Sequence, residues 1–170
     1  MGFLADAIET LADTPTRAAH LTRGLSEQQL SRKPNPDFFS LREHVLHLRD
    51  IDIEGYEKRV QRILTESSPV LEDVNGGQLA RERNYNAQPL EPALVELAIA
   101  RAASLERLQQ CQESDLERTA EMQGSGVLTL RRLLEMWMRH DAEHLADMKE
   151  LRRALEAGDP KVSFGEHEAA

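Results

Sequence analysis

Two histidines late in the chain are the residues best suited to chemistry. His140 and His144 stand four positions apart. On a helix, residues at this spacing lie on one face, one turn apart, so their imidazoles can bind the same metal ion. Six histidines are present in the 170 residues, so such a pair can also arise by chance. The spacing therefore suggests a metal site without establishing one.

The place of this pair on its helix strengthens the prediction. Apolar residues recur here with the period of a helix, so one face should meet a core. His140 and His144 fall in the gap of this stripe, and we expect them to point inward. The alternative is a pair of core histidines that only form hydrogen bonds with their neighbours, because bare imidazoles in a core need polar partners. The stripe consists of Leu130, Leu133, Leu134, Trp137, Met148, Leu151 and Leu155.

A third histidine for the same site could come from an earlier helix. His44 and His47 are three positions apart, so both can face one way on a helix. Three neutral imidazoles would leave at least one coordination position open, which is typical of catalytic metal sites. The residues alone do not decide which of these two histidines would join His140 and His144.

Four amphipathic helices should position these residues. Ser40 and Glu43 form a capping-box pattern that starts the second helix. Thr14-Pro15 either kinks the first helix or starts a new one with Thr14 as its cap. We found no stretch whose alternation predicts a strand. The sequence therefore predicts an all-α four-helix bundle, with helices at about 3–23, 41–65, 90–111 and 130–157.

The connections suggest one domain with a long crossover. Residues 67–88 contain helix breakers, among them Asn75-Gly76-Gly77, and exceed what a tight bundle turn needs. We expect this segment to cover a site or to run the length of the bundle. Residues 1–160 are predicted to form the single bundle, and residues 161–170 a flexible tail.

Composition excludes some classes of function. Thirty acidic against 21 basic residues give a net charge of −9, which argues against nucleic acids or anionic membranes as partners. The single cysteine, Cys111, excludes an internal disulfide and fits a reducing cytoplasm. No signal peptide and no apolar run of membrane-spanning length are present. We therefore expect a cytoplasmic protein that acts on small molecules.

Several charged residues allow two interpretations. Asp50, three positions after His47, could orient a ligand or be a solvated helix charge. Asp141 and Glu143 flank the histidine pair and are predicted to lie at the surface. Arg101 interrupts an apolar stripe, and it could hold an anionic substrate group or pair with Asp52. We favour the structural pair.

Two segments resemble a known family. The stretch from Phe39 to Asp50, FSLREHVLHLRD, resembles the WS-x-x-E-x-x-x-H-L-x-D segment that opens the second helix of DinB/YfiT-like proteins. The stretch from Leu128 to Asp147 resembles the T-L-x-x-L-L … H-D-x-x-H-L pattern of their last helix. The order and separation of the motifs extend the resemblance over nearly the whole chain. One departure is Phe39, which stands where the family has Trp and retains an apolar anchor without the indole N–H.

The resemblance implies a specific fold and site. The fold would be an up-down-down-up four-helix bundle with long cross-connections. The family's metal triad falls on His47, His140 and His144, with His44 as a neighbour and no further catalytic residue assigned. The bound group would be a divalent metal, zinc first, with nickel, iron and manganese also suited to such ligands.

The resemblance also implies a range of activities. Some family members are metal-dependent transferases that use a low-molecular-weight thiol, which implies a thiol S-transferase with a metal-activated thiolate. A metal-dependent hydrolase and a non-catalytic metal-binding or small-molecule-binding bundle are the alternatives. A further alternative is a scaffold whose histidines are structural. The family also implies a homodimer.

Overall fold

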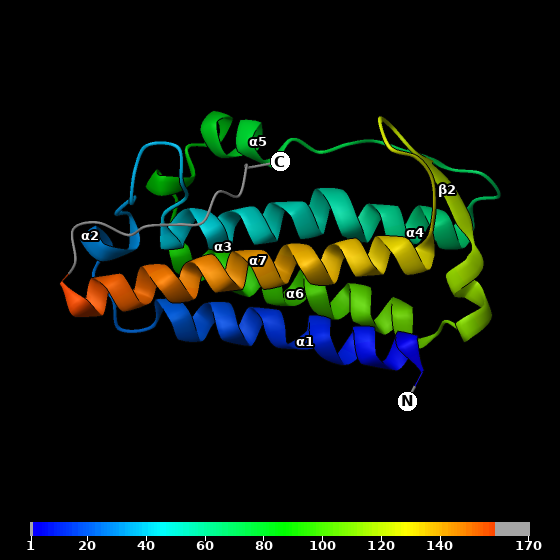
Figure 1. The fold of residues 1–170 in the computed structure, drawn as a ribbon, viewed down its shortest axis with the longest axis horizontal. Coiled ribbons are helices and arrows are strands. Elements are labelled where there is room, and N and C mark those ends of the chain that lie inside the picture. Colours follow the sequence, from blue (N-terminus) through cyan, green and yellow to red (C-terminus); the bar gives the residue numbers. More distant parts are fainter. Residues whose placement is uncertain (1, 159–170) are drawn as a thin grey trace.

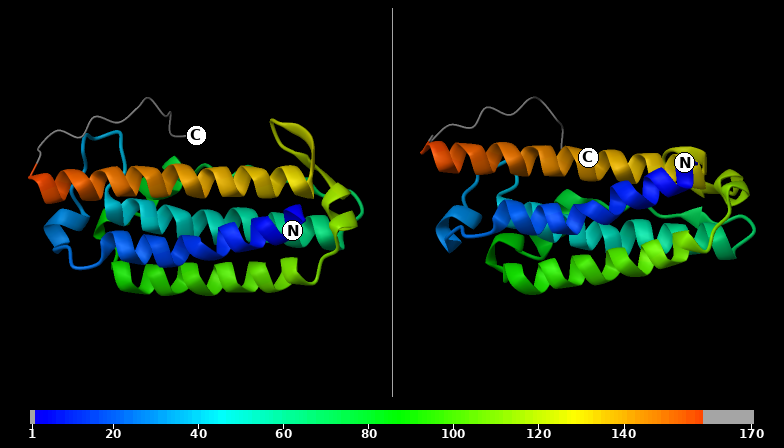
Figure 2. Two further views of the ribbon diagram at one scale, coloured as in Figure 1. Left: turned by 60° about the horizontal axis from the view of Figure 1, so that its bottom comes forward. Right: turned by 90° about the horizontal axis from the view of Figure 1, so that it is seen from below.

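Four long helical rods lie side by side in the computed structural model, which describes residues 2–158 (Figures 1 and 2). The first and last rods run in one direction, and the two middle rods run in the other. This confirms the predicted all-α, up-down-down-up four-helix bundle. The rods are α1 (Phe3–Thr22), the continuous series α3 (Leu41–Asp50), η1 (Ile51–Tyr56) and α4 (Glu57–Thr65), then α6 (Leu90–Gln109) and α7 (Leu130–Ala157).

The connection between α4 and α6 runs back along the bundle, as expected for a crossover (Figure 1). It contains a two-residue strand near one end and two short helices near the other. The remaining short elements are α2, which joins α1 to α3, and η3, which follows α6. Their bounds are α2 (Glu27–Leu30), β1 (Val70–Leu71), α5 (Gly76–Glu82), η2 (Tyr85–Ala87) and η3 (Glu113–Glu117).

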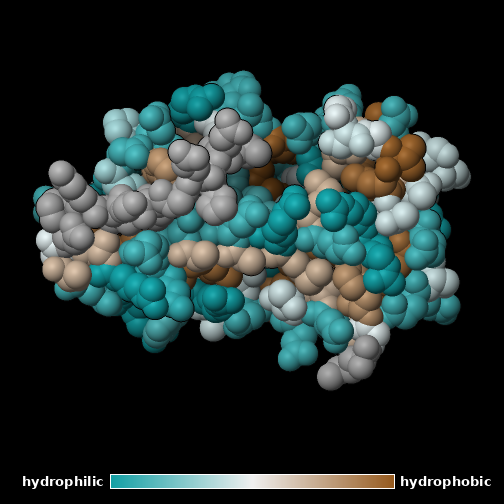
Figure 3. All heavy atoms as spheres, viewed as in Figure 1, coloured by the Kyte–Doolittle hydropathy of each residue, from teal (hydrophilic) through white to brown (hydrophobic). Residues whose placement is uncertain are grey.

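A small sheet, which the sequence did not predict, closes one end of the bundle. Strand β2 (Thr119–Met122) pairs parallel with β1 and antiparallel with β3 (Gly126–Thr129). These strands have only two to four residues, too few for their alternation to stand out. Apolar side chains gather on the surface at this end (Figure 3).

The second rod begins at the predicted capping box, whereas Thr14 has a different role. The Ser40 hydroxyl accepts the Glu43 N–H, and the Glu43 carboxylate accepts the Ser40 N–H at 2.8 Å. The first helix passes through Pro15 without restarting, so Thr14 is not a cap. Instead the Thr14 hydroxyl donates to the Asp141 carboxylate at 2.7 Å, across the bundle.

A buried polar layer separates two apolar clusters in the core. One cluster contains Leu11 and Trp137, and the other contains Ala18 and Leu145. Between them lies Arg101, whose side chain is 1% exposed. The layer therefore divides the core across its width, close to the middle of α1, α6 and α7.

Arg101 binds two carboxylates from different rods. Its Nε and Nη2 donate to the two oxygens of Asp52 at 2.9 Å each, and Nη2 also lies 2.7 Å from Asp141. The Trp137 indole N–H donates to Asp52 at 3.0 Å. The predicted Arg101–Asp52 pair is confirmed. The prediction that Asp141 lies at the surface was wrong, because Arg101 and Thr14 hold its carboxylate in the interior.

Pro15 of α1 leaves a backbone carbonyl available to accept from the same guanidinium. Pro15 has no N–H, so the Leu11 carbonyl lacks its usual partner within the helix. Arg101 Nη1 donates to that carbonyl. All four rods thus contribute a polar group to the layer.

The remaining sequence predictions can be placed against this fold. No helix within residues 2–158 is long and apolar enough to cross a membrane. The end of the predicted domain at residue 160 and the predicted tail at 161–170 lie outside the described residues. The homodimer and the cytoplasmic location stay predictions.

Removal of the Arg101 guanidinium should strongly destabilise the bundle. Arg101→Leu leaves Asp52 and Asp141 buried without their cation, so we expect the free energy of unfolding to fall by about 3–5 kcal/mol in urea titrations. Arg17→Leu is the control, because the Arg17–Asp13 pair is exposed and is expected to contribute below about 1 kcal/mol. Equal losses in the two variants would contradict this role for Arg101.

Candidate metal centre

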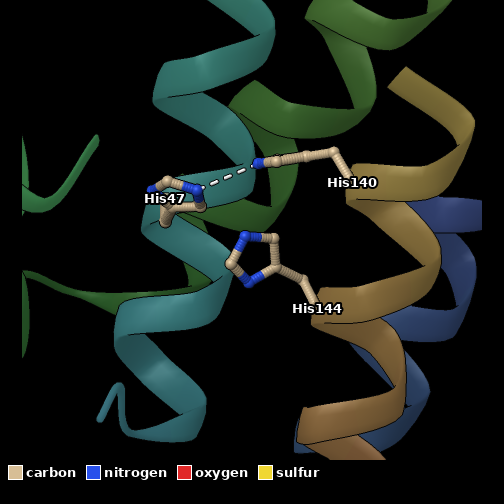
Figure 4. A group of neighbouring side chains, drawn as sticks. All are labelled: His47, His140 and His144. Atoms are coloured by element: carbon tan, nitrogen blue, oxygen red, sulfur yellow. Dashed lines mark hydrogen bonds between the residues drawn. The ribbon is translucent and has the colours of Figure 1, made fainter. Parts of the chain in front are cut away.

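The structure brings the three predicted ligands together at the middle of the bundle. His47 comes from α3, and His140 and His144 come from α7 (Figure 4). One ring nitrogen from each histidine lies within 4.8 Å of the other two. His47 Nε2 is 3.0 Å from His140 Nε2. Helical spacing accounts for the pair on α7, whereas only the packing of α3 against α7 adds His47.

The charge state of the rings suits metal binding. Burial lowers the pKa of His47 and of His144 well below the usual value, and the neighbouring histidines lower it further. Both rings are therefore neutral near pH 7. Neutral imidazole is the form that offers a lone pair to a cation, so no proton has to leave before an ion binds.

The donor set and its spacing fit a small divalent ion. Two nitrogens bound to one zinc ion at about 2.0–2.1 Å with tetrahedral angles lie about 3.3 Å apart. The 3.0 Å between His47 Nε2 and His140 Nε2 is close to that value. Three imidazoles and no thiolate form the ligand set of an open site rather than of a closed structural one.

The second nitrogen of each ring has a different environment. His140 Nδ1 lies 3.4 Å from the Asp141 carboxylate, a long contact. His144 Nδ1 lies 2.9 Å from His44 Nδ1. His47 Nδ1 is buried and has no hydrogen-bond partner among the described residues. The outer nitrogens of His140 and His144 thus have a polar neighbour, whereas the outer nitrogen of His47 has none among the described residues.

Gly76 of the cross-connection packs against the His47 ring. A Cβ atom at this position would lie 2.2 Å from His47 Cε1 and 2.6 Å from His47 Nδ1. Only glycine permits this approach, because such distances are far inside van der Waals contact. The sequence marked Asn75-Gly76-Gly77 only as a loop signal, and nothing in it indicated contact with a histidine.

A pocket of about 540 Å³ opens over the histidines. Phe39 forms part of its wall and packs on the rings of His44 and His47, with centroids 5.5 and 5.2 Å away. Tyr56 lines it from η1 and stacks on Trp137 at 4.8 Å. The cross-connection contributes further lining residues, so it covers a site as well as running along the bundle. Sequence reasoning missed Tyr56, since one tyrosine in a helix carries no signal.

The structure also places Asp50, Glu143 and Trp137, which the sequence had singled out. Asp50 is buried, which excludes the solvated alternative, and its carboxylate accepts from Tyr85 Oη at 2.6 Å and from Arg83 at 2.7 Å. Asp50 therefore anchors the cross-connection to α3. Glu143 is exposed as predicted and reaches the pocket rim. Trp137 is a core residue, as expected.

A second group of ligand atoms shares one histidine with the first. His44, His144 and Asp147 also bring one potential ligand atom each within 4.8 Å of the others. Burial lowers the pKa of His44 to about 3, with His140 adding to the shift, so this ring is neutral too. His144 belongs to both groups: one of its ring nitrogens faces His44, and the other faces His47 and His140.

Comparison with known proteins decides the family. A model described as the DinB superfamily matches residues 10–148. The chain belongs to the DinB superfamily. The fold agrees, since this DinB chain superposes on YfiT from Bacillus subtilis with a TM-score of 0.82 at 19% identity, covering 90% of this chain and 87% of that one. That structure is described as "a probable metal-dependent hydrolase with an unusual four-helix bundle topology".

Curated relatives of this DinB chain include proteins named for metal-dependent hydrolysis. YuaE of Bacillus subtilis is 27% identical over 147 residues, covering 79% of this chain and 90% of YuaE. "Putative metal-dependent hydrolase BH0277" of Halalkalibacterium halodurans is 22% identical over 143 residues, covering 84% and 82%. A similarly named protein of Oceanobacillus iheyensis is 26% identical over 146 residues, covering 85% and 83%.

A methyl group at residue 76 should disturb the site through His47. Gly76→Ala forces the His47 ring to move, so we expect the zinc dissociation constant to rise about tenfold or more, the scale of changes to groups that surround a ligand. Competition with a chromophoric chelator measures this. Gly77→Ala is the matched control, because its Cβ meets only ordinary contacts at 3.6 and 3.7 Å. Unchanged affinity in Gly76→Ala would show that His47 does not bind the ion.

Proposed function

We propose that this protein is a metal-dependent hydrolase whose ion is held by His47, His140 and His144. The observation that carries the proposal is the convergence of three imidazoles beneath an open pocket. A bound divalent ion would polarise a substrate oxygen and lower the pKa of a coordinated water toward neutrality. Three protein ligands leave a position for that chemistry, which a closed site would not.

The chain's own residues prepare the site in two ways. The α7 backbone fixes the spacing of His140 and His144, and the packing of α3 and Gly76 sets the position of His47. Asp141, itself held by Arg101, lies beside the outer nitrogen of His140. These groups are anchored in the bundle, so the ligand nitrogens need little rearrangement to bind an ion.

The pocket fits a small molecule. A volume of about 540 Å³ lies within the usual range for small-molecule sites. Its walls combine apolar side chains, including Phe39 and Met136, with charged groups at the rim. The rim carries more carboxylates than guanidinium groups, so it should repel anions. The charged lining residues are Asp37, Asp73, Glu143 and Asp147 against Arg59 and Arg139.

The hydrolase is preferred over the thiol S-transferase that the family resemblance implied. The named relatives support metal-dependent hydrolysis, and none of their names mentions a thiol. Cys111 is a poor internal thiolate nucleophile, because burial raises the pKa of its thiol. A transferase would need an external thiol in the same pocket. Thiol transfer is therefore tested beside hydrolysis in the assays below.

Loss of any one ligand should abolish metal binding and turnover together. We expect the wild type to bind one equivalent of zinc. In His47→Ala, His140→Ala or His144→Ala, zinc affinity should fall by at least about 100-fold, which is more than the loss expected when a residue around the ligands is changed. Elemental analysis measures the metal, and a panel of activated esters and amides measures hydrolysis. His20→Ala, at an exposed position of α1, is the control.

Three results would oppose the hydrolase proposal. The first is hydrolysis that persists at the wild-type rate in His140→Ala. The second is a wild type that takes up no metal. The third is metal-dependent consumption of a low-molecular-weight thiol with a model electrophile, in the absence of hydrolysis, which would favour the transferase.

The acidic rim predicts a preference among substrates. Neutral esters should have a higher kcat/KM than anionic esters of matched size and leaving group, because the rim carboxylates repel negative charge. The difference should shrink as salt is added, since screening weakens charge effects at the surface. Steady-state kinetics at low and high ionic strength measure both effects. Equal preference at low salt would contradict the prediction.

A further inference from the structure

His44 is a buried histidine that the triad leaves without a role. It lies on α3 one turn before His47, the residue is 4% exposed, and the Phe39 ring meets it edge-on. Its Nδ1 is 2.9 Å from Nδ1 of His144. A separation of this size is within hydrogen-bonding range, and in such a bond one ring donates and the other accepts.

The direction of that bond decides which nitrogen His144 can offer. A neutral imidazole has one N–H and one lone pair. One ring nitrogen of His144 points to the gap between His47 and His140, and the other points away (Figure 4). Since Nδ1 is the one beside His44, the nitrogen in the gap is Nε2. Nε2 has a free lone pair only when the proton is on Nδ1.

We propose that His44 is a positioning residue for the metal site: its Nδ1 accepts the Nδ1–H of His144 and thereby presents His144 Nε2 as the ligand. The inference deepens the proposed function and depends on its metal site. His44 does for His144 what a carboxylate or backbone carbonyl does for ligand histidines in many metal proteins, which is to fix both the tautomer and the ring orientation.

The surroundings of the two rings support this assignment. His140 has Asp141 beside its outer nitrogen, whereas His44 is the partner that the structure gives to the outer nitrogen of His144. Phe39 also stacks on the His144 ring, with an interplanar angle of 20°. The hydrogen bond and the stacking together restrict rotation of a ring that borders the open pocket.

A second cation in the group of His44, His144 and Asp147 is the rival interpretation. If His144 bound one ion through Nε2 and another through Nδ1, the neutral ring would have to lose its one N–H proton. One proton shared between the two Nδ1 atoms requires no such loss and accounts for their 2.9 Å separation. The hydrogen-bonded arrangement is therefore the one we adopt.

The tautomer can be measured without any metal or substrate. Long-range ¹H–¹⁵N correlation spectra of metal-free wild-type protein distinguish a protonated from an unprotonated ring nitrogen. We expect His144 to carry its proton on Nδ1, and we expect part of the population to shift to the Nε2–H form in His44→Leu. A role limited to packing would leave the tautomer unchanged. An Nε2–H form of His144 in the wild type would overturn the proposal.

Zinc affinity supplies the second measurement. His44→Leu keeps an apolar side chain but removes the acceptor, so the zinc dissociation constant should rise about 10–100-fold. His44→Asn, whose amide oxygen can replace Nδ1 as acceptor, should recover most of the affinity. His20→Leu controls for loss of an unrelated histidine. If His44→Leu and His44→Asn lose affinity equally, the hydrogen bond is not the cause and the proposal fails.

The number of zinc ions bound per chain distinguishes this proposal from a second cation site and from failure of the proposed hydrolase function. Two zinc ions per wild-type chain, reduced to one in His44→Leu, would overturn it in favour of a second cation site. A wild type that binds neither zinc nor any other divalent metal would refute the proposed hydrolase. The spectra of the metal-free wild type would then still decide whether His44 holds His144 in the Nδ1–H form, and they do not depend on any variant folding correctly.

Discussion

The buried guanidinium of Arg101 is the interaction on which the rest of the bundle depends. It sits between two apolar clusters and binds Asp52, Asp141 and the Leu11 carbonyl, so every rod has a polar group committed to it. Such a charge is costly to bury, and the cost is offset only when every donor has a partner in good geometry. That requirement restricts how far each rod can slide or rotate relative to the others, because a displaced rod would carry its polar group away from the guanidinium.

The candidate metal site lies directly beside this layer. Asp141 accepts from Thr14 and binds Arg101 while also approaching the outer nitrogen of His140. The η1 segment is π-helical, with a wider turn than an α-helix, and π-helical turns occur frequently at functional sites. It contributes Asp52 to the layer and Tyr56 to the pocket. The groups that hold the rods together and the groups that orient the ligands are thus neighbours in one continuous network.

Much of this arrangement could be predicted from local patterns. Apolar periodicity and capping signals gave four long helices, and the structure has them with ends within two residues of those expected. Arg101 and Asp52 each interrupt an apolar stripe, which was enough to suggest their pairing. The short strands and the burial of Asp141 were not predicted. Both depend on partners from distant parts of the chain, for which a local pattern carries no signal.

The sequence by itself determined the helices, the shared face of His140 and His144 and, through family resemblance, the choice of His47 as the third member. Helical geometry is local, so residue spacing alone sets which side chains share a face. Only the tertiary structure decided that Gly76 presses on His47, that His44 faces His144, and that a pocket lies above them. These contacts join segments up to 100 positions apart. Their distances depend on how closely the rods and the crossover pack, which spacing along the chain does not encode.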